Sequence, residues 1–153
     1  MYKGLEMDID SKVEKQLIFS ELFILQNKIQ TKFDKILNEI TSKQFIILMI
    51  TNSFLTPPSL TEVANHAGCS RQNVKKIAVV LEQKGFVKLM PEKGTRAIRI
   101  HLQEKFHTFY DEFMHVWGDG IEVLFQGMIE QQVHALFESL HLVEENVDRY
   151  VKE

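Results

Sequence analysis

Apolar residues recur three or four positions apart over long stretches of this chain, a spacing typical of amphipathic α-helices. The first stretch runs from about residue 9 to residue 37, and its apolar stripe is wider than one core contact needs. We therefore expect this helix to be buried on two sides. Ser11, Thr41 and Ser59 each stand three residues before a Glu or Gln, a capping-box pattern that predicts a helix start at each position.

Between residues 59 and 85 the pattern predicts two short helices. The first, Leu60–His66, leads into a tight turn at Gly68. The second follows Ser70, a suitable N-cap, and continues to Lys84, where Gly85 provides the C-terminal cap.

Two strand-like runs come next, residues 86–90 and 97–102, and a polar loop of residues 91–96 joins them. The order of helix, turn, helix and hairpin predicts a winged helix-turn-helix over about residues 41–102. Such a unit presents its second helix to the major groove of DNA and its loop to the backbone or the minor groove.

Two further helices are predicted at residues 103–126 and 128–151, with Gly127 between them. The first helix and these last two have apolar stripes that a winged helix cannot cover, so we expect them to form a dimer. The predicted fold is mainly α (α+β): one domain over residues 1–153, in which dimerisation helices at about 9–37 and 103–151 flank the winged unit.

Charge is distributed unevenly along the chain. Residues 70–99 contain eight Lys or Arg and two Glu, a local net charge of +6, whereas the whole chain carries −3. The remainder therefore carries −9, so overall charge cannot attract a polyanion but this segment can. Double-stranded DNA is the partner that this distribution favours.

Composition excludes several other classes of protein. No uncharged apolar run reaches the roughly 18 residues of a membrane span, so no membrane partner is expected. The single cysteine, Cys69, and the absence of a hydrophobic signal core favour a cytoplasmic protein. We expect Cys69 to behave as a small buried hydrophobe rather than as a redox switch. Phosphate-loop, GxSxG and HExxH motifs are all missing, so neither enzymatic activity nor a cofactor is predicted.

The candidate DNA-binding residues belong to the three parts of the predicted winged unit. At 100° per residue, Gln72 and Lys76 point away from the face that buries Val74 and Leu81. Gln and Asn suit bidentate contacts with adenine, and Arg suits guanine. The predicted recognition helix contributes Ser70, Arg71, Gln72, Asn73, Lys75 and Lys76, the loop contributes Lys93, Thr95 and Arg96, and the start of the preceding helix contributes Ser59 and Thr61. Plain helix capping is an equally good explanation for Ser59 and Thr61.

The order and spacing of these elements resemble the MarR family of bacterial transcriptional regulators over nearly the whole chain. The residues that carry the resemblance are Thr41-Ser-Lys-Gln44-Phe, Leu60-Thr-Glu-Val-Ala64 with Gly68, Ser70-Arg-Gln-Asn-Val-Lys-Lys-Ile77, Leu81-Glu-Gln-Lys-Gly-Phe86 and Leu124-Phe-Gln-Gly127. The resemblance implies a homodimeric repressor that places two recognition helices in adjacent major grooves. It also implies release by an effector, often a small aromatic acid.

The wing departs from the pattern of this family. Its members usually carry an Asp two residues before the wing arginine, whereas Gly94 stands two residues before Arg96 in this chain. The usual local partner of Arg96 is therefore missing. A winged-helix protein-interaction module or antirepressor without DNA binding remains the alternative function.

Two candidate sensor sites lie on the helix predicted from residue 103. Its aromatic residues, which could line an effector cavity or simply pack a dimer core, are Phe106, Phe109, Tyr110, Phe113 and Trp117. His107, Asp111 and His115 stand four residues apart on one face, a spacing that could hold a metal ion. The alternative is that these three side chains are merely solvated. We therefore do not predict a metal site.

Overall fold

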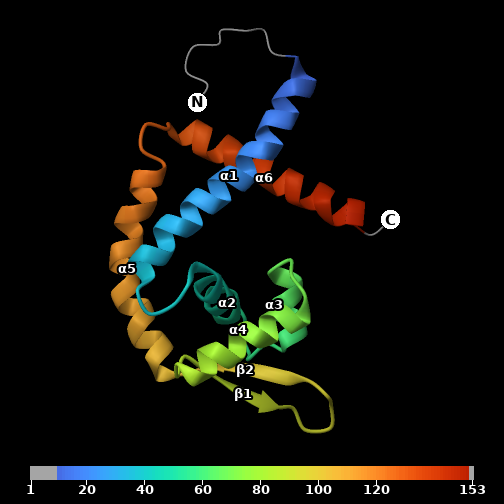
Figure 1. The fold of residues 1–153 in the computed structure, drawn as a ribbon, viewed down its shortest axis with the longest axis vertical. Helices are drawn as coiled ribbons and strands as arrows, with labels where there is room; N and C mark the ends of the chain where they lie inside the picture. The colour runs from blue at the N-terminus through green and yellow to red at the C-terminus, as the bar shows by residue number, and fades with distance from the viewer. Residues whose placement is uncertain (1–9, 152–153) are drawn as a thin grey trace. The chain divides into compact units, whose positions relative to one another are not determined.

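The computed structural model describes residues 10–151, apart from the side chains of residues 115, 116 and 151. The chain forms two compact units, one reaching Phe106 and the other starting at His107. The first unit contains α1 (Ser11–Leu37), α2 (Ser42–Asn52), α3 (Leu60–His66), α4 (Arg71–Gln83), β1 (Val87–Pro91) and β2 (Ile98–Leu102) (Figure 1). The second contains most of α5 (Glu104–Leu124) and all of α6 (Glu130–Val151). This order confirms the predicted mainly helical fold with a hairpin wing.

Local side-chain caps explain where the helices of the first unit begin. The hydroxyl of Thr41 accepts a hydrogen bond from the Gln44 amide, and the Gln44 side chain accepts one from the Thr41 amide, as predicted. Ser59 and Glu62 form the same reciprocal pair at the start of α3. The prediction for α1 was wrong by one residue, because Asp10 is the N-cap and its carboxylate accepts from the Lys12 amide at 3.2 Å. Asp caps a helix as well as Ser does.

Two glycines make the turns that end α3 and α4. Gly68 has a φ of +59° and Gly85 a φ of +81°, left-handed conformations that favour a residue without a Cβ. After each turn an amide reaches back to close the helix end: Cys69 donates to the Ala64 carbonyl at 3.1 Å, and Phe86 donates to Leu81 at 2.9 Å. These turns set the directions in which α4 and the hairpin leave the preceding element.

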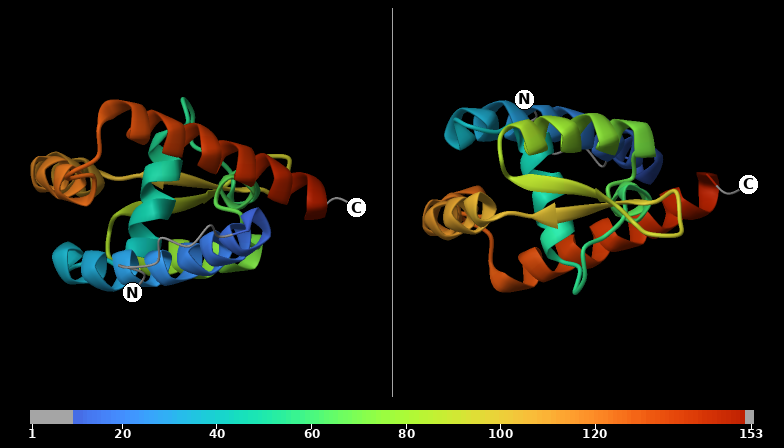
Figure 2. Two further views of the ribbon diagram at one scale, coloured as in Figure 1. Left: turned by 90° about the horizontal axis from the view of Figure 1, so that it is seen from above. Right: turned by 90° about the horizontal axis from the view of Figure 1, so that it is seen from below.

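The core of the first unit lies among α2, α3, α4 and the hairpin. Leu48, Val63, Val74 and Ile100 come from these elements, Phe86 immediately precedes β1, and each of the five is at most 1 % exposed. The strands pair in antiparallel register and form a two-stranded sheet. The loop that joins them extends past α3, as the view from below shows (Figure 2). The hairpin is therefore anchored at its base, while its loop is free to meet another molecule.

Only the C-terminal end of α1 contributes to this core. Phe33 and Leu37 are buried, and the Phe33 ring packs edge-on against Phe45 of α2 at 5.4 Å between centroids. Most of the helix keeps large apolar side chains exposed, among them Ile18, Phe19 and Phe23 at 57 % to 64 %. The burial of α1 on two sides along its length therefore stays a prediction.

The second unit consists of two helices joined by a short turn. Gly118 and Gly120 do not interrupt α5, which ends at Leu124, two residues earlier than predicted. Gly127, with a φ of +88°, lies in the turn, and α6 begins at Glu130 rather than at about residue 128. No described helix is long and apolar enough to cross a membrane.

Candidate nucleic-acid interface

The N-terminal half of α4 presents a continuous polar face. Val74, Ala78 and Leu81 are completely buried and anchor the helix. The side chains that the sequence assigned to DNA contact are exposed: Arg71, Gln72, Asn73, Lys75 and Lys76. They combine cations for phosphates with amides that can read base edges. The helix therefore packs against the core through one face and exposes its polar face.

The charge at the start of α4 differs from that of an ordinary helix. Helix N-termini favour acidic residues, because the backbone dipole places positive charge there. The first turn of α4 has no acidic residue and begins instead with Arg71. The first turn of α2 has no acidic residue either, whereas the first turns of α1, α3, α5 and α6 all contain Glu. Ser70 caps the end by accepting from the Asn73 amide at 3.2 Å. A cationic side chain at the positive end of the helix dipole adds to the attraction of this end for an anion.

The start of α3 is occupied by its own cap. The Ser59 amide donates to the Glu62 carboxylate at 2.7 Å, and the Ser59 hydroxyl accepts from the Glu62 amide at 3.2 Å. The hydrogen bonds from Ser59, with the nearby Arg99 guanidinium, lower the pKa of the Glu62 carboxyl. Plain capping, the alternative considered for Ser59, is thus present. Thr61 is exposed on the first turn of the helix.

The wing loop is a closed turn that displays two cations. The Glu92 amide donates to the Ala97 carbonyl at 3.0 Å, and the Thr95 amide donates back to the Glu92 carbonyl at 3.3 Å. Gly94 takes a φ of +80° at the tip. Lys93 and Arg96 are exposed on this turn. Thr95 is exposed too, but its hydroxyl accepts from the Ala97 amide at 3.0 Å and lies 3.3 Å from a carboxylate oxygen of Glu92.

Two basic residues of the segment 70–99, Lys84 and Arg99, form contacts within the first unit instead. The Lys84 ammonium donates to the Glu39 carbonyl at 2.7 Å and to the Gln44 side chain at 3.3 Å, tying the end of α4 to the loop before α2. The Arg99 guanidinium lies between two carboxylates, those of Glu62 and Glu92. The local charge of +6 therefore overstates the charge that can face a polyanion. Its exposed part consists of the other six basic residues on α4 and the hairpin: Arg71, Lys75, Lys76, Lys88, Lys93 and Arg96.

Sequence reasoning missed the role of Arg99. Its spacing from Glu92 could suggest a pair across the hairpin, because the strands place Met90 opposite Arg99 and Glu92 just beyond. Its contact with Glu62, 37 residues away, depends on the tertiary packing of β2 beside Ser59. No periodicity or motif indicates such a contact.

The predicted effector residues include a run of rings on α5. Phe109 and Phe113 are stacked at 5.6 Å between centroids, and Phe113 lies 5.8 Å from Trp117. Phe106 and Phe113 are buried, while Phe109, Tyr110 and Trp117 are partly exposed. Whether these rings bind an effector stays a prediction.

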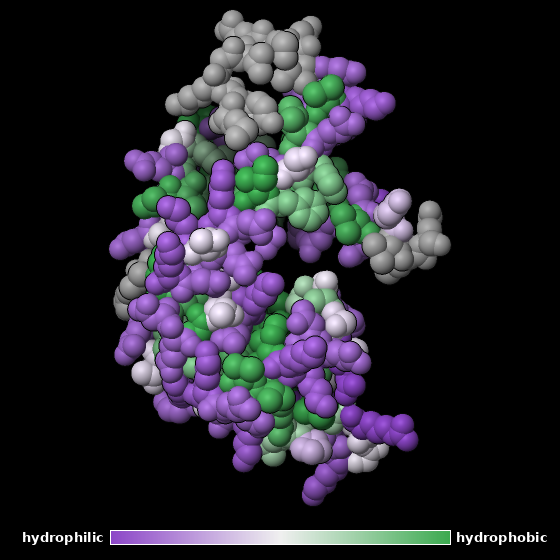
Figure 3. All heavy atoms as spheres, in the orientation of Figure 1, coloured by the Kyte–Doolittle hydropathy of each residue, from purple (hydrophilic) through white to green (hydrophobic). Residues whose placement is uncertain are grey.

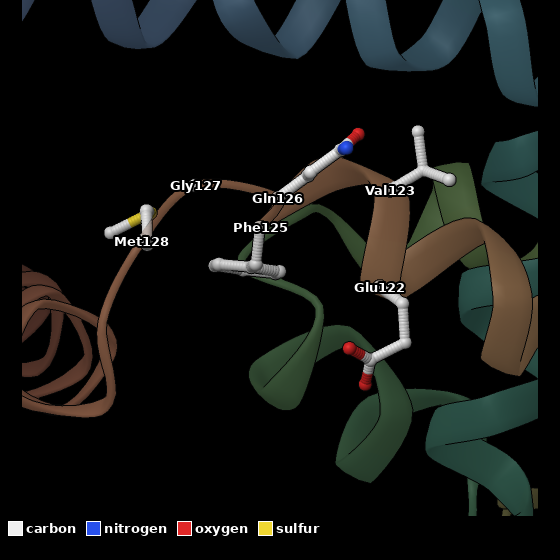
Figure 4. A pocket seen from close by; sticks show the side chains of 6 residues that line it. All are labelled: Glu122, Val123, Phe125, Gln126, Gly127 and Met128. Carbon is white, nitrogen blue, oxygen red and sulfur yellow. The ribbon is translucent and has the colours of Figure 1, made fainter.

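A shallow hollow of about 470 Å³ lies at the turn between α5 and α6 (Figure 4). Its lining, all of it in the described part of the chain, consists of Glu122, Val123, Phe125, Gln126, Gly127 and Met128, and includes none of the predicted effector residues. The hollow therefore does not test the effector prediction.

The predicted metal triad is described only in part. His107 and Asp111 are exposed on α5, but the side chain of His115 lies outside the described residues. Among the side chains that are described, no group of three or more His, Cys, Asp or Glu could hold a metal ion.

Cys69, which was expected to behave as a small buried hydrophobe, is half-buried rather than fully buried.

The fold is that of a winged helix-turn-helix extended by helices at both ends. It is also the fold of solved MarR-type transcriptional regulators. A MarR protein from Peptoclostridium difficile matches with a TM-score of 0.78 and 17 % identity over 97 % of this chain and 93 % of that one. MepR of S. aureus, solved in complex with DNA, matches with a TM-score of 0.75 and 15 % identity over 84 % of this chain and 97 % of that one.

A third solved structure of this fold contains a bound ligand. The organohalide-sensing transcriptional regulator RdhR, in its 2,4-dichlorophenol-bound form, matches with a TM-score of 0.77 and 13 % identity over 93 % of this chain and 88 % of that one. No protein-family model matches the sequence, and no curated protein sequence matches it. The likeness is therefore one of fold, at sequence identities below 20 % for these three structures.

Proposed function

We propose that this protein is a non-enzymatic transcriptional regulator that binds specific sequences of double-stranded DNA. The observation that carries the proposal is the exposed polar face of α4, with Gln72 and Asn73 among three cations and a fully buried opposite face. An Arg at the N-terminus of this helix, where most helices of the chain have a Glu, adds to it. A structure of the same fold was solved with DNA bound.

In this proposal, α4 enters the major groove and the wing lies against the neighbouring backbone or minor groove. Gln72 and Asn73 read base edges, while Arg71, Lys75 and Lys76 contact either bases or phosphates. Lys93 and Arg96 contact the DNA from the wing, with Thr61 as a further phosphate contact. Ser59, Ser70 and Thr95 act mainly through the hydrogen bonds that shape these elements.

We infer that the active species is a homodimer. Apolar side chains reach the surface along α1 and along α6 (Figure 3). On α6 the exposed stripe consists of Val133, Leu136, Phe137, Leu140, Val143 and Val147, which recur at helical spacing. Fully burying an exposed side chain of this kind contributes about 1.5–3 kcal/mol. These side chains are 37 % to 63 % exposed, so a second copy of the chain would gain part of that free energy at each position. A dimer would read two half-sites about 34 Å apart.

We further propose that the protein represses transcription by occluding promoters and that a small aromatic compound releases it. The ring run of Phe109, Phe113 and Trp117 supports an aromatic ligand, and a regulator of the same fold was solved with 2,4-dichlorophenol bound. The alternative, a winged-helix protein-interaction module, is favoured by the acidic charge outside residues 70–99.

Selection from a random DNA library tests DNA binding without knowledge of the operator. Enrichment of a two-fold symmetric motif is expected, bound at least about 10³-fold more tightly than random DNA at physiological salt. DNA from upstream of the protein's own gene should be tested in parallel by gel shift. Failure to enrich any motif, with only weak and steeply salt-dependent binding, would favour the protein-interaction module.

A further inference from the structure

The Arg99 side chain joins three separate segments of the first unit. Its Nε donates to Glu92 Oε1 at 2.9 Å, and Nη2 lies 2.9 Å from the same oxygen. Its Nη1 donates to the Pro57 carbonyl at 2.9 Å and lies 3.4 Å from Glu62 Oε2. Glu92 is at the base of the wing loop, whereas Pro57 and Glu62 belong to the loop before α3 and to α3 itself. One guanidinium therefore ties the wing to the first helix of the helix-turn-helix.

The backbone of β2 reinforces this tie. Arg99 forms an isolated antiparallel bridge with Ser59, and the Ile100 amide donates to the Pro58 carbonyl at 2.8 Å. Glu62 is itself held by the Ser59 amide at 2.7 Å. One of the two carboxylates that contact Arg99, that of Glu62, is therefore also held by a backbone hydrogen bond.

Glu92 extends the tie into the loop that carries the exposed cations. Its second carboxylate oxygen lies 3.3 Å from the Thr95 hydroxyl, which in turn accepts from the Ala97 amide at 3.0 Å. Lys93 and Arg96 are thus attached to a turn whose two ends are both connected to Arg99. MarR-family proteins usually have an Asp two residues before the wing arginine, where this chain has Gly94. Without Glu92, the loop would therefore have no carboxylate to orient it.

The charge of Arg99 argues against a direct phosphate contact. Its side chain is 31 % exposed and faces two carboxylates, so the Arg99–Glu92–Glu62 network carries a net charge of −1. A phosphate would have to displace a charge-assisted pair in which two guanidinium nitrogens share one carboxylate oxygen of Glu92. Such a pair can hold two segments at a fixed distance and orientation. A planar guanidinium does this better than a Lys ammonium, because its donors point in fixed directions.

We propose that Arg99 is a positioning residue for DNA binding, which holds the wing at a fixed place relative to the helix-turn-helix through Glu92 and Glu62. This inference rests on the proposed function. A wing that is ordered before binding loses less conformational entropy on contact with DNA, so more of the interaction of Lys93 and Arg96 appears as affinity. Glu92 thereby replaces the missing Asp from a different position on the loop.

Arg99→Lys and Glu92→Gln test the two halves of the network in the full-length protein. Arg99→Lys keeps the positive charge and removes the fork, so a direct Coulomb contact with DNA would survive while the positioning would not. Glu92→Gln removes a negative charge near DNA, so charge alone predicts tighter binding and positioning predicts weaker binding. Both variants should bind the selected site a few-fold more weakly. Lys88→Gln, on an exposed position of β1 outside the network, should lower affinity only through its lost charge.

Coupling to Arg96 separates positioning from a general loss of stability. In the wild type, Arg96→Ala should weaken binding and shallow the salt dependence by roughly one phosphate equivalent. In the Arg99→Lys background the same change should have little further effect, because the wing is no longer held. Equal losses in both backgrounds, wild-type affinity in Arg99→Lys, or tighter binding by Glu92→Gln would each overturn the inference.

Hydrogen exchange without DNA makes the test independent of the proposed function. The amides of Glu92, Thr95 and Ala97, all hydrogen-bonded within the wing, should exchange faster in Arg99→Lys and Glu92→Gln but not in Lys88→Gln. Unchanged exchange in both network variants would refute the tie even if the protein binds DNA. If Arg99→Lys does not fold, Glu92→Gln serves for both measurements. If the wild type binds no DNA, the proposed function fails, while exchange still decides whether the network holds the wing.

Discussion

Gln72 and Asn73 are adjacent on the first turn of α4, and both are exposed while Val74 behind them is buried. Their amide groups can donate to and accept from the same base, which is the basis of bidentate adenine recognition. Neither carries a charge, so neither contributes to the general attraction of α4 for phosphates. The proposed function therefore assigns base reading and phosphate binding to different side chains, which mutation can separate.

We predict that Gln72→Ala or Asn73→Ala costs about 1–3 kcal/mol on the preferred site and leaves binding to random DNA nearly unchanged. Gln83→Ala, at the other end of the same helix, is the matched control and should change neither. Anisotropy titrations at one salt concentration with both kinds of DNA measure the effect. An equal loss on both would mean that these amides do not read bases.

Residue exposure was the most predictable part of the site. The 3.6-residue period placed the polar face of α4 correctly, because helical geometry alone decides which side chains share a face. The function of each basic residue was less predictable. Lys84 and Arg99 looked equivalent to Lys75 and Lys76 in the sequence, yet the structure uses them to hold the loop before α2 and the wing.

Single side chains set how elements join as well as where they begin. Asp34, near the end of α1, accepts a hydrogen bond from the Ser42 amide at the start of α2. This bond, with the nearby charge of Lys43, lowers the pKa of the Asp34 carboxyl below its ordinary value of 3.8. The ionised form is therefore the one that stabilises the junction between α1 and α2.

This junction should make stability depend on pH. Because the pKa of Asp34 is lower in the folded state than in the unfolded state, its contribution is fully present at neutral pH and is lost as the pH falls below about 4. Urea unfolding should show Asp34→Asn to be less stable than the wild type at pH 7, with the difference shrinking as the pH falls below about 4. Asp111→Asn, exposed on α5, is the control. A difference that stays constant over this range would show that the Asp34 charge does not matter.

The boundaries of the helices were predictable where the residues that cap and end each helix are close to it in the sequence. The boxes at Thr41 and Ser59 and the turns at Gly68 and Gly85 depend on residues within one helical turn of each other, so the sequence was sufficient. Asp10 took the place of Ser11 because two good N-cap residues are adjacent and sequence alone cannot rank them. The tie from Arg99 to Glu62 joins elements, and no local rule predicts it.

At the scale of the whole molecule, the surplus of exposed apolar surface leads to the prediction of a constitutive dimer. Light scattering at micromolar concentration should give about twice the chain mass of 17.9 kDa. Phe137→Lys, in the middle of the α6 stripe, should shift the protein toward the monomer. Leu142→Lys is matched in exposure, 58 % against 63 %, but lies near the opposite face of α6 and should leave the dimer intact. A wild-type mass near 17.9 kDa would end the proposal.

The last prediction concerns the aromatic ligand that is proposed to release the protein from DNA. A phenolic compound such as 2,4-dichlorophenol should raise the melting temperature and release DNA at the same concentrations, because a ligand shifts two states only by preferring one of them. Trp117 is the only tryptophan, and it lies at the end of the ring run on α5, so its fluorescence reports binding directly. Phe109→Ala should weaken that response, while Phe125→Ala, beyond the end of α5, should not. Zinc should change neither melting nor DNA affinity. This prediction is contradicted if no aromatic compound acts, micromolar zinc alters DNA binding and His107→Ala abolishes the effect of zinc. The protein would then be a metal sensor, and the rings of α5 would serve only to pack the protein.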